Sequence, residues 1–285
     1  MKLTFLGTAA AEGIPGLWCG CAICREARKR GGKDIRRRCS YLIDDDTLVD
    51  FGPDSFDQMR MANINLAELK RIIFTHAHAD HMSPEQLLYR RSPGFCTDVP
   101  DHYLDVLGSK RTLRELMRVI ISSNSPTLDG VHIFDYLRIN PITVTAGERV
   151  KSGDVELLPV TASHAPGLDA LIYVIRRGGR TLLIANDTGW LADEAWAMLD
   201  GVKLDAVIIE CTIGFRNPDA NKTHQGFNTT VKFREKLIEM GCLAPDAPAY
   251  VTHFSHNGLG LHADFEARFN PHGITVAYDG MTVDI

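Results

Sequence analysis

The sequence predicts one α/β domain over residues 1–285, with helices covering the outer faces of β-sheet structure. Three observations lead to this fold class. Strand-like and helix-like segments mix along the whole chain instead of gathering in separate halves. The chain has no internal repeat, no low-complexity linker and no break in composition. Hydrophobic residues make up 45% and charged residues 24%, which is ordinary for a globular protein.

The first half of the chain predicts short strands separated by turn residues. A strand at 2–6 ends at Gly7 and Thr8, which form a turn signal. The next stretch, up to residue 39, is rich in Gly, Cys and Arg and predicts irregular structure. Ser83 is a plausible N-cap for a helix that begins with Pro84. Further strands are expected at 40–43, 47–49 and 69–74, and further helices at 54–62 and 109–122.

The second half continues the alternation. Residues 142–160 read as strands, and strands at 170–176 and 180–184 are joined by a Gly178-Gly179 turn. Strands are also expected at 206–210, 249–252 and 274–285, and helices at 192–199, 228–240 and 261–269.

Charge and cysteine content limit the function classes. The net charge is -5 and no long basic stripe is visible, so binding to extended nucleic acid is not expected. The one basic run, residues 33–38, is either a solvated loop or a contact for an anionic substrate. The chain has seven cysteines, no signal-peptide pattern and no apolar run of about 20 residues. These features predict a cytoplasmic protein without a membrane span.

Three of the cysteines, Cys19, Cys21 and Cys24, lie within six positions. A disulfide uses two thiols and a structural zinc uses four ligands, so a metal site here needs one more ligand. Zinc binding would order a glycine-rich loop that has little apolar surface of its own. The alternative is three free thiols.

A second cluster follows the strand expected at 69–74. His76, His78, Asp80 and His81 stand within six residues, and imidazole and carboxylate groups suit divalent zinc, manganese or iron. This is more than one ion needs, so His76 and His78 can serve one ion and Asp80 and His81 a second. Polar residues of the same ligand types follow other expected strands, namely His164, Asp187 and His253.

This constellation resembles the metallo-β-lactamase superfamily, through the His-x-His-x-Asp-His signature followed in order by His, Asp and His. The resemblance implies an α/β fold with four layers, an αβ/βα sandwich, and a dinuclear site between its sheets. It implies that one metal is bound by His76, His78 and His164, the other by Asp80, His81 and His253, with Asp187 as bridge and Asp50 buried behind the ligands.

The cysteine cluster, with Gly7-Thr8 and Gly13-Ile14-Pro15 before it, resembles the phosphodiesterases of the phosphonate-degrading carbon–phosphorus lyase pathway. Those proteins split phosphoribosyl cyclic phosphate. The resemblance implies a structural zinc held by three cysteines and one histidine, in a loop at about 13–39. His256 is the best candidate for the fourth ligand, and His224 is its rival.

The same resemblance implies a mechanism. Two divalent ions, Mn²⁺ or Zn²⁺ and alternatively Fe, activate a water that attacks phosphorus. Asp80 orients the nucleophile as well as binding metal, and His224 donates a proton to the departing oxygen. For His224 the alternative is a capping or structural role. Cys211 lies outside the ligand pattern and is expected to be a buried thiol.

The expected function is therefore hydrolysis of a small or cyclic nucleotide-like phosphodiester, with phosphoribosyl cyclic phosphate as one candidate. A tRNA 3′-processing endonuclease would need an arm for tRNA, and residues 94–139 carry no glycine-rich basic arm. A protein of quinone-cofactor biosynthesis would have degenerate metal ligands, which this chain does not. A metal-dependent binding protein is a further alternative, and a β-lactamase is the least favoured. A homodimer is one expectation for the assembly.

Overall fold

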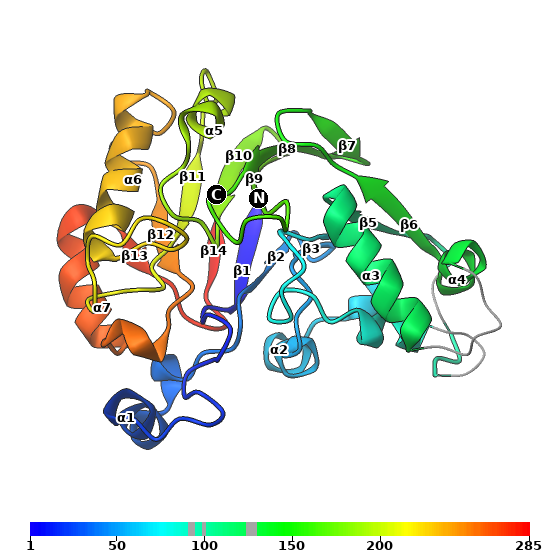
Figure 1. The fold of residues 1–285 in the computed structure, drawn as a ribbon, viewed down its shortest axis with the longest axis horizontal. Coiled ribbons are helices and arrows are strands. Elements are labelled where there is room, and N and C mark those ends of the chain that lie inside the picture. Colours follow the sequence, from blue (N-terminus) through cyan, green and yellow to red (C-terminus); the bar gives the residue numbers. More distant parts are fainter. Residues whose placement is uncertain (91–94, 99–100, 124–129) are drawn as a thin grey trace.

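The computed structural model describes residues 1–90, 95–98, 101–123 and 130–285. Its frame is a pair of seven-stranded sheets that pack face to face, with helices on the outer side of each (Figure 1). The layers therefore run helix, sheet, sheet, helix, and the predicted αβ/βα sandwich is confirmed.

The first sheet has the strand order β14-β1-β2-β3-β4-β5-β6. Helices α2, α3 and α4 cover its outer face (Figure 1). Its strands are β1 (Lys2–Gly7), β2 (Ser40–Ile43), β3 (Thr47–Val49), β4 (Arg71–Ile73), β5 (Leu104–Gly108), β6 (Ile139–Thr143) and β14 (Thr282–Asp284), and its helices are α2 (Ser55–Ala62), α3 (Lys110–Ser122) and α4 (Gly130–Leu137).

The second sheet has the order β13-β12-β11-β10-β9-β8-β7, and α5, α6 and α7 cover its outer face. Its strands are β7 (Val150–Ser152), β8 (Val155–Thr161), β9 (Leu171–Arg177), β10 (Arg180–Ala185), β11 (Ala206–Glu210), β12 (Ala249–Thr252) and β13 (Thr275–Val276), and its helices are α5 (Asp193–Met198), α6 (Phe227–Glu239) and α7 (His262–Phe269).

Three apolar clusters hold the layers together. The inner one lies between the sheets and includes Phe5 and Tyr41 from the first sheet and Tyr173 and Ile184 from the second, all fully buried. The other two lie between each sheet and its helices. In α3 the sequence periodicity predicts one apolar face with Leu113, Leu116, Met117 and Ile120, and the structure buries all of these except Met117, which is 37% exposed.

Two expectations about local structure are wrong. Residues 22–30, expected to be irregular, form helix α1 (Ala22–Arg30), in which Cys21 Sγ caps the amide of Cys24. The sequence has no apolar stripe there that would predict a helix, and only two residues of α1 are buried. The helix expected after Ser83 is a 3-10 helix, Pro84–Arg90. Other 3-10 turns span Gly32–Asp34, Leu66–Glu68, His256–Gly258 and Asn270–His272.

The segment 94–139, considered above as a place for a tRNA arm, supplies β5, α3 and α4. Residues 94, 99–100 and 124–129 of this segment lie outside the described residues. None of the helices in the described part of the chain is long and apolar enough to cross a membrane.

The directions of the strands determine where the polar residues that follow them come together. β10, β11 and β12 run parallel, and so do β3 and β4, so the carboxyl ends within each set lie at one edge. β8 is antiparallel to β9, which is antiparallel to β10, so β8 also ends at that edge. The segments that follow β4, β8, β10 and β12 carry the histidines and aspartates singled out in the sequence.

Candidate metal centre

The first group of ligands consists of His76 and His78, in the loop after β4, and His164, after β8. Their ligand nitrogens all lie within 4.8 Å of one another. His78 Nδ1 is 2.9 Å from His76 Nε2 and 3.2 Å from His164 Nε2. A tetrahedral zinc with Zn–N bonds of about 2.0–2.1 Å holds neighbouring nitrogens about 3.3 Å apart. The three imidazoles therefore fit one metal ion.

The protonation state of this group also suits a metal. Burial lowers the pKa of His76 well below its usual value. Burial also lowers the pKa of His164, against an opposing effect of the Asp187 charge. Both imidazoles are therefore neutral near pH 7, which leaves a nitrogen lone pair free to bind a cation.

The second group consists of Asp80, His81, Asp187 and His253, whose ligand atoms also lie within 4.8 Å of one another. His81 Nε2 is 3.0 Å from Asp80 and 2.5 Å from Asp187, and His253 Nε2 is 3.2 Å from Asp187. Both of these nitrogens are buried, and neither makes a hydrogen bond within the described part of the chain. Buried polar atoms without partners are costly, so the geometry fits a cation among them.

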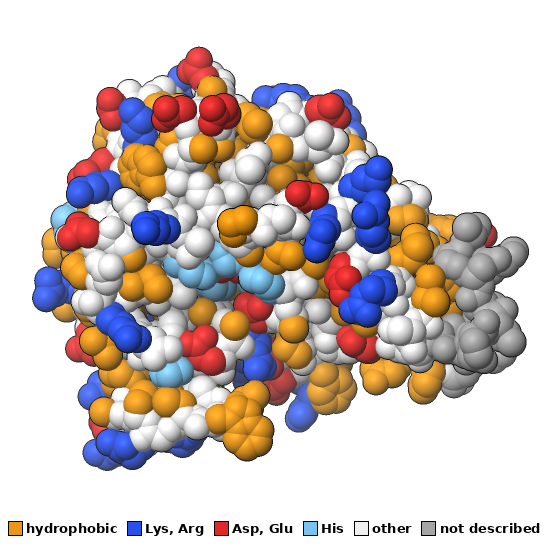
Figure 2. All heavy atoms as spheres, in the orientation of Figure 1, with side chains coloured by type: hydrophobic (Ala, Val, Ile, Leu, Met, Phe, Trp, Pro, Cys, Tyr) orange, Lys and Arg blue, Asp and Glu red, His pale blue; other side chains and the backbone are white. Residues whose placement is uncertain are grey.

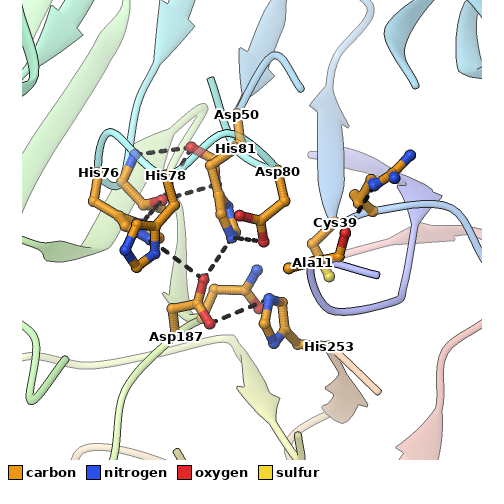
Figure 3. A network of polar contacts seen from close by, with 12 residues as sticks. Ala11, Cys39, Asp50, His76, His78, Asp80, His81, Asp187 and His253 are labelled. Atoms are coloured by element: carbon orange, nitrogen blue, oxygen red, sulfur yellow. Dashed lines mark hydrogen bonds and ion pairs between the residues drawn. The ribbon is translucent and has the colours of Figure 1, made fainter. Parts of the chain in front are cut away.

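Asp187 lies between the two groups (Figure 3). One of its carboxylate oxygens, Oδ2, is 3.7 Å from His76 Nε2 and 2.5 Å from His81 Nε2, while Oδ1 faces His253. Asp187 is thus the one carboxylate of the set that contacts ligands of both groups. This is the bridging position that the resemblance implies for it.

Asp50 stands behind the second group, where it is fully buried at the end of β3. Its Oδ2 is 2.7 Å from His81 Nδ1, and its Oδ1 accepts from the backbone amide of Thr75 at 2.8 Å. A carboxylate on the far nitrogen of a metal-binding histidine fixes the tautomer and orients the ring. Asp50 therefore turns His81 Nε2 towards Asp80 and Asp187, as Figure 3 shows.

The histidines of the centre are visible from outside the molecule. Figure 2 shows them as a pale blue group in a hollow near the middle of one face. His76 and His81 are fully buried, whereas His78, His164 and His224 are partly exposed. The buried members are thus held rigidly, and the exposed ones border the opening through which a substrate would enter.

Glu210 is a residue of the site that the sequence reasoning missed. It is fully buried at the end of β11, and its Oε1 is 2.8 Å from His224 Nδ1. Its Oε2 accepts from Thr212 Oγ1 at 2.5 Å, and the same hydroxyl is 2.8 Å from His253 Nδ1. One carboxylate therefore orients both His224 and His253. The signal available in the sequence was its place as the last residue of the apolar strand expected at 206–210.

His224 lies beside the second group, with Nδ1 3.4 Å from Asp187 Oδ1. Burial alone would lower the pKa of His224, but the charge of Glu210 and its hydrogen bond outweigh burial and raise that pKa to about 9. The ring is also 4.8 Å from the ring of His164, measured between centroids. His224 therefore borders both ligand groups, on a loop that precedes α6.

The cysteine cluster gains its fourth member from the far end of the chain. The ligand atoms of Cys19, Cys21, Cys24 and His256 lie within 4.8 Å of one another. His256 Nδ1 is 3.7 Å from Cys19 Sγ and 3.7 Å from Cys21 Sγ. With Zn–S bonds of about 2.3 Å, a tetrahedral zinc separates sulfur and nitrogen by about 3.6 Å, so the group fits zinc. His224, the rival for this position, lies at the other site.

The thiolate character of one member, Cys21, supports this fit, whereas burial raises the pKa of Cys24 to about 12. Burial would raise the pKa of Cys21, but the backbone amide of Cys24 and the neighbouring thiols and imidazole lower it to about 6. A thiolate is the form of cysteine that binds a metal. Cys211 is different, since it is fully buried and burial raises its pKa to about 12, as expected for an inert thiol.

The basic run at 33–38 does not supply a free cation to the site. Arg36 is buried and donates to Thr8 Oγ1 at 2.7 Å. Arg37 pairs with Asp57, and Arg38 pairs with Asp54 at 2.6 Å. A contact between one of these arginines and an anionic substrate stays a prediction, and each guanidinium already has a partner within the protein.

A two-sheet sandwich with histidines and aspartates gathered at the strand ends defines a class of protein, the metal-dependent hydrolases of the metallo-β-lactamase fold. A family model described as the β-lactamase superfamily domain matches residues 46–254. This match covers well over half of the chain, and the chain belongs to this family. The predicted superfamily and hydrolase class are confirmed.

Two curated proteins match parts of the chain. An octanoyltransferase of Porphyromonas gingivalis is 34% identical over 86 residues, which are 29% of this chain and 16% of that protein. The exodeoxyribonuclease YycJ of Bacillus anthracis is 24% identical over 142 residues, 50% of this chain and 45% of that protein. The matches thus span less than half of either relative's length.

Solved structures resemble the whole chain. A diphosphatase of the PhnP family has a TM-score of 0.72 at 24% identity, with 99% of this chain and 96% of that chain covered. Zinc-bound PqqB from Methylobacterium extorquens also has a TM-score of 0.72, at 17% identity and with 100% of both chains covered. At these identities the likeness concerns the fold.

Proposed function

We propose that this protein is a two-metal phosphodiesterase that hydrolyses a cyclic or small nucleotide-like phosphodiester, with phosphoribosyl cyclic phosphate as the leading candidate. The observation that carries the proposal is His224. It is held by the buried carboxylate of Glu210 and stands 3.4 Å from Asp187, beside two groups of ligands that each fit a divalent ion. A proton donor beside a dinuclear site is the arrangement that cleavage of a P–O bond needs.

The residues of the first group, His76, His78 and His164, would hold one ion. Asp80, His81 and His253 would hold the other, with Asp187 shared between them. Manganese, zinc and iron all suit such ligands. When bound, the two ions supply an activated water as nucleophile and neutralise charge on the phosphoryl oxygens.

Side chains of the protein orient the nucleophile and supply the proton. Asp80 orients the nucleophile. Glu210 accepts the Nδ1 proton of His224, which leaves Nε2 to carry a proton towards the departing oxygen. The remote oxygen of the same carboxylate holds His253 through Thr212, so proton donor and metal ligand are oriented together. The cysteine cluster with His256 would hold a structural zinc.

The proposal is tested by hydrolysis of bis-p-nitrophenyl phosphate. Metal-stripped protein receives manganese, zinc or iron in turn, and metal content is measured alongside turnover. We expect turnover that depends on added metal. Two bound ions without turnover on this ester or on a cyclic ribosyl phosphate would instead favour a binding or biosynthetic role.

His224→Ala tests the proton donor. We expect turnover to fall about 10²- to 10⁴-fold with unchanged metal content, because the proton donor is lost while the ligands remain. His272→Ala, which removes an exposed imidazole that packs on Phe227, is the matched control and should keep full turnover. Unchanged turnover in His224→Ala would refute its role.

A nuclease is the second candidate, since the exodeoxyribonuclease YycJ matches half of this chain. The same metal centre would then cleave the phosphodiesters of a polynucleotide. Digestion of a single-stranded DNA oligonucleotide, compared with a cyclic ribosyl phosphate at equal concentration, separates the two. The net charge of -5 favours the small substrate.

A further inference from the structure

The cysteine segment, residues 16–30, lies outside the metal centre and exposes two large apolar side chains. Leu17 is 71% exposed and Trp18 is 99% exposed, so neither contributes to the packed core. Single exposed apolar residues are common on protein surfaces. The groups that surround Trp18 therefore decide whether it belongs to a binding site.

Two arginines are held against the loop that carries Trp18. Arg28 donates to the carbonyl oxygen of Cys19 at 3.1 Å and to that of Gly16 at 3.3 Å. Arg25 donates to the carbonyl oxygen of the residue after Cys19. A carbonyl group is neutral, and neither arginine has a carboxylate partner among the residues that the structure describes. An indole and two uncompensated positive charges are thus fixed on one short loop.

The charge of the cysteine segment is opposite to that of the whole chain. One acid, Glu26, stands against four cations, which gives +3, whereas the whole chain carries -5. The four cations are Arg25, Arg28, Lys29 and Arg30. A zinc ion bound by three thiolates would contribute about -1 and leave the segment positive. The expectation against nucleic acid rests on the charge of the whole chain and does not describe this segment, which attracts anions.

The cysteine segment is a neighbour of the metal centre. His256, which completes the thiol cluster, follows the metal-binding residue His253 by three positions. Three residues of chain span at most about 11 Å. Figure 1 places α1 at the lower end of the molecule, and Figure 2 shows Lys, Arg and hydrophobic side chains there, on the face with the histidines. A strand of a few nucleotides is therefore long enough to contact both.

We infer that the cysteine segment binds single-stranded nucleic acid, with a base stacked on Trp18 and backbone phosphates on Arg25 and Arg28. Aromatic stacking and cationic contacts to phosphate are the interactions that hold single strands without reading their sequence. Guanidinium groups also match the geometry of phosphate. Two exposed apolar side chains are fewer than the apolar helix face that binds a membrane surface. The inference goes beyond the proposed function, because it concerns binding outside the metal centre and holds whether or not the bound strand is cleaved.

The test measures the Kd of a labelled single-stranded DNA of about 12 nucleotides for the zinc-loaded protein by fluorescence anisotropy, and a gel records cleavage separately. We expect Trp18→Ala to weaken binding about 5- to 100-fold, the value of one stacked base, and Trp18→Phe to keep part of the affinity. An abasic strand of the same length should bind the parent as weakly as the parent strand binds Trp18→Ala. Arg25→Gln should lower the slope of log Kd against log salt by about 0.7, the value of one phosphate contact.

Two variants outside the segment serve as matched controls. Tyr103→Ala removes an aromatic ring that is 50% exposed, and Arg114→Gln removes an exposed cation on α3. Both should bind the strand as the parent does. The zinc content of every variant should equal that of the parent, which shows that the segment is still folded.

Unchanged affinity in Trp18→Ala, equal binding of the abasic strand, or no saturable binding would overturn the inference. Binding to vesicles of phosphatidylglycerol without binding to the strand would overturn it in favour of a membrane surface. Hydrolysis of bis-p-nitrophenyl phosphate by a protein that does not bind the strand would leave the phosphodiesterase proposal intact. Binding through Trp18 without hydrolysis of any ester would instead overturn the phosphodiesterase proposal alone.

Discussion

At the scale of single residues, the metal centre depends on unusual backbone conformations. Asp50, Asp187 and His253 have φ angles of 60°, 44° and 58°. Left-handed conformations of non-glycine residues cost about 1 kcal/mol or more each and persist where the surroundings fix them. Each of the three stands directly after a strand or within two residues of its end, where the turn directs its side chain into the site.

Gly52 shows how tightly this loop region is packed. A Cβ atom at Gly52 would lie 2.1 Å from the carbonyl oxygen of Asp80, a backbone atom that cannot move alone. We therefore expect Gly52→Ala to displace the segment that carries Asp80 and His81. The second metal should be bound at least about 10-fold more weakly, because loss of ligand geometry has this effect. Metal titration of the stripped protein measures it.

Gly20→Ala is the control for this variant, because a Cβ atom there would meet nothing within 4 Å. Gly20 lies in the cysteine cluster and not beside Asp80 or His81, so the affinity of the second metal should equal that of the parent protein. Parent-like metal affinity in Gly52→Ala would show that the loop adapts to the added methyl group.

At the scale of elements, the segment that carries the cysteine cluster is distinguished by how little apolar packing it has. In α1 only Cys24 and Ala27 are buried, while Leu17 and Trp18 in the loop before it are 71% and 99% exposed. What holds the segment is its hydrogen bonds and the cluster of thiols around His256. Its order should therefore depend on zinc.

Cys24→Ser tests this dependence. We expect loss of one zinc per chain and cleavage by trypsin within α1, at the exposed Arg25, Arg28, Lys29 and Arg30. The parent protein should resist until a chelator is added. Cys96→Ser removes a thiol outside the cluster and should keep both the zinc and the resistance. Equal resistance in Cys24→Ser would mean that zinc does not order the loop.

At the scale of the whole molecule, an ion pair joins the two sheets at the end opposite the metal centre. Asp46, in the turn between β2 and β3, accepts from Arg177 at the end of β9, with distances of 2.5 and 3.0 Å. Burial alone would raise the pKa of Asp46, but the hydrogen bonds and charge of Arg177 lower it to about 2. The pair therefore stabilises the packing of one sheet on the other.

This pKa predicts how stability depends on pH. In the unfolded chain an aspartate titrates near 3.9, so the contribution of Asp46 is fully present above about pH 5 and is lost as pH falls towards 2. Asp46→Asn should lower the free energy of unfolding by about 1–2 kcal/mol at pH 7 and by progressively less below pH 4. Urea unfolding at pH 7, 4, 3 and 2 measures this.

Asp219→Asn serves as the surface control, since Asp219 is exposed and its nearest cation, Lys232, is 4.0 Å away. It should change stability little at any pH. A difference between parent and Asp46→Asn that is equal at pH 7 and pH 2 would contradict the ion-pair account. The expected homodimer stays a prediction, to be checked by the mass of the protein in solution.

The sequence by itself determined the class of this protein. Metal-ligand residues such as His76, His78 and His81 can be recognised from the sequence because they follow one apolar strand at short, fixed spacing. The three clustered cysteines can be recognised in the same way, because they lie within six positions of the sequence. Strand and helix periodicity gave the alternating elements, and it failed at α1, where a polar helix is opened by a cysteine cap and has no apolar stripe.

Only the tertiary structure decided which distant residues meet. It brings His256, and not His224, to the three thiols. It places Glu210 within hydrogen-bond distance of His224. It also gives Arg36, Arg37 and Arg38 partners within the protein. The physical reason is that these relations are set by the parallel register of β10, β11 and β12 and by the packing of two sheets, which local sequence does not encode.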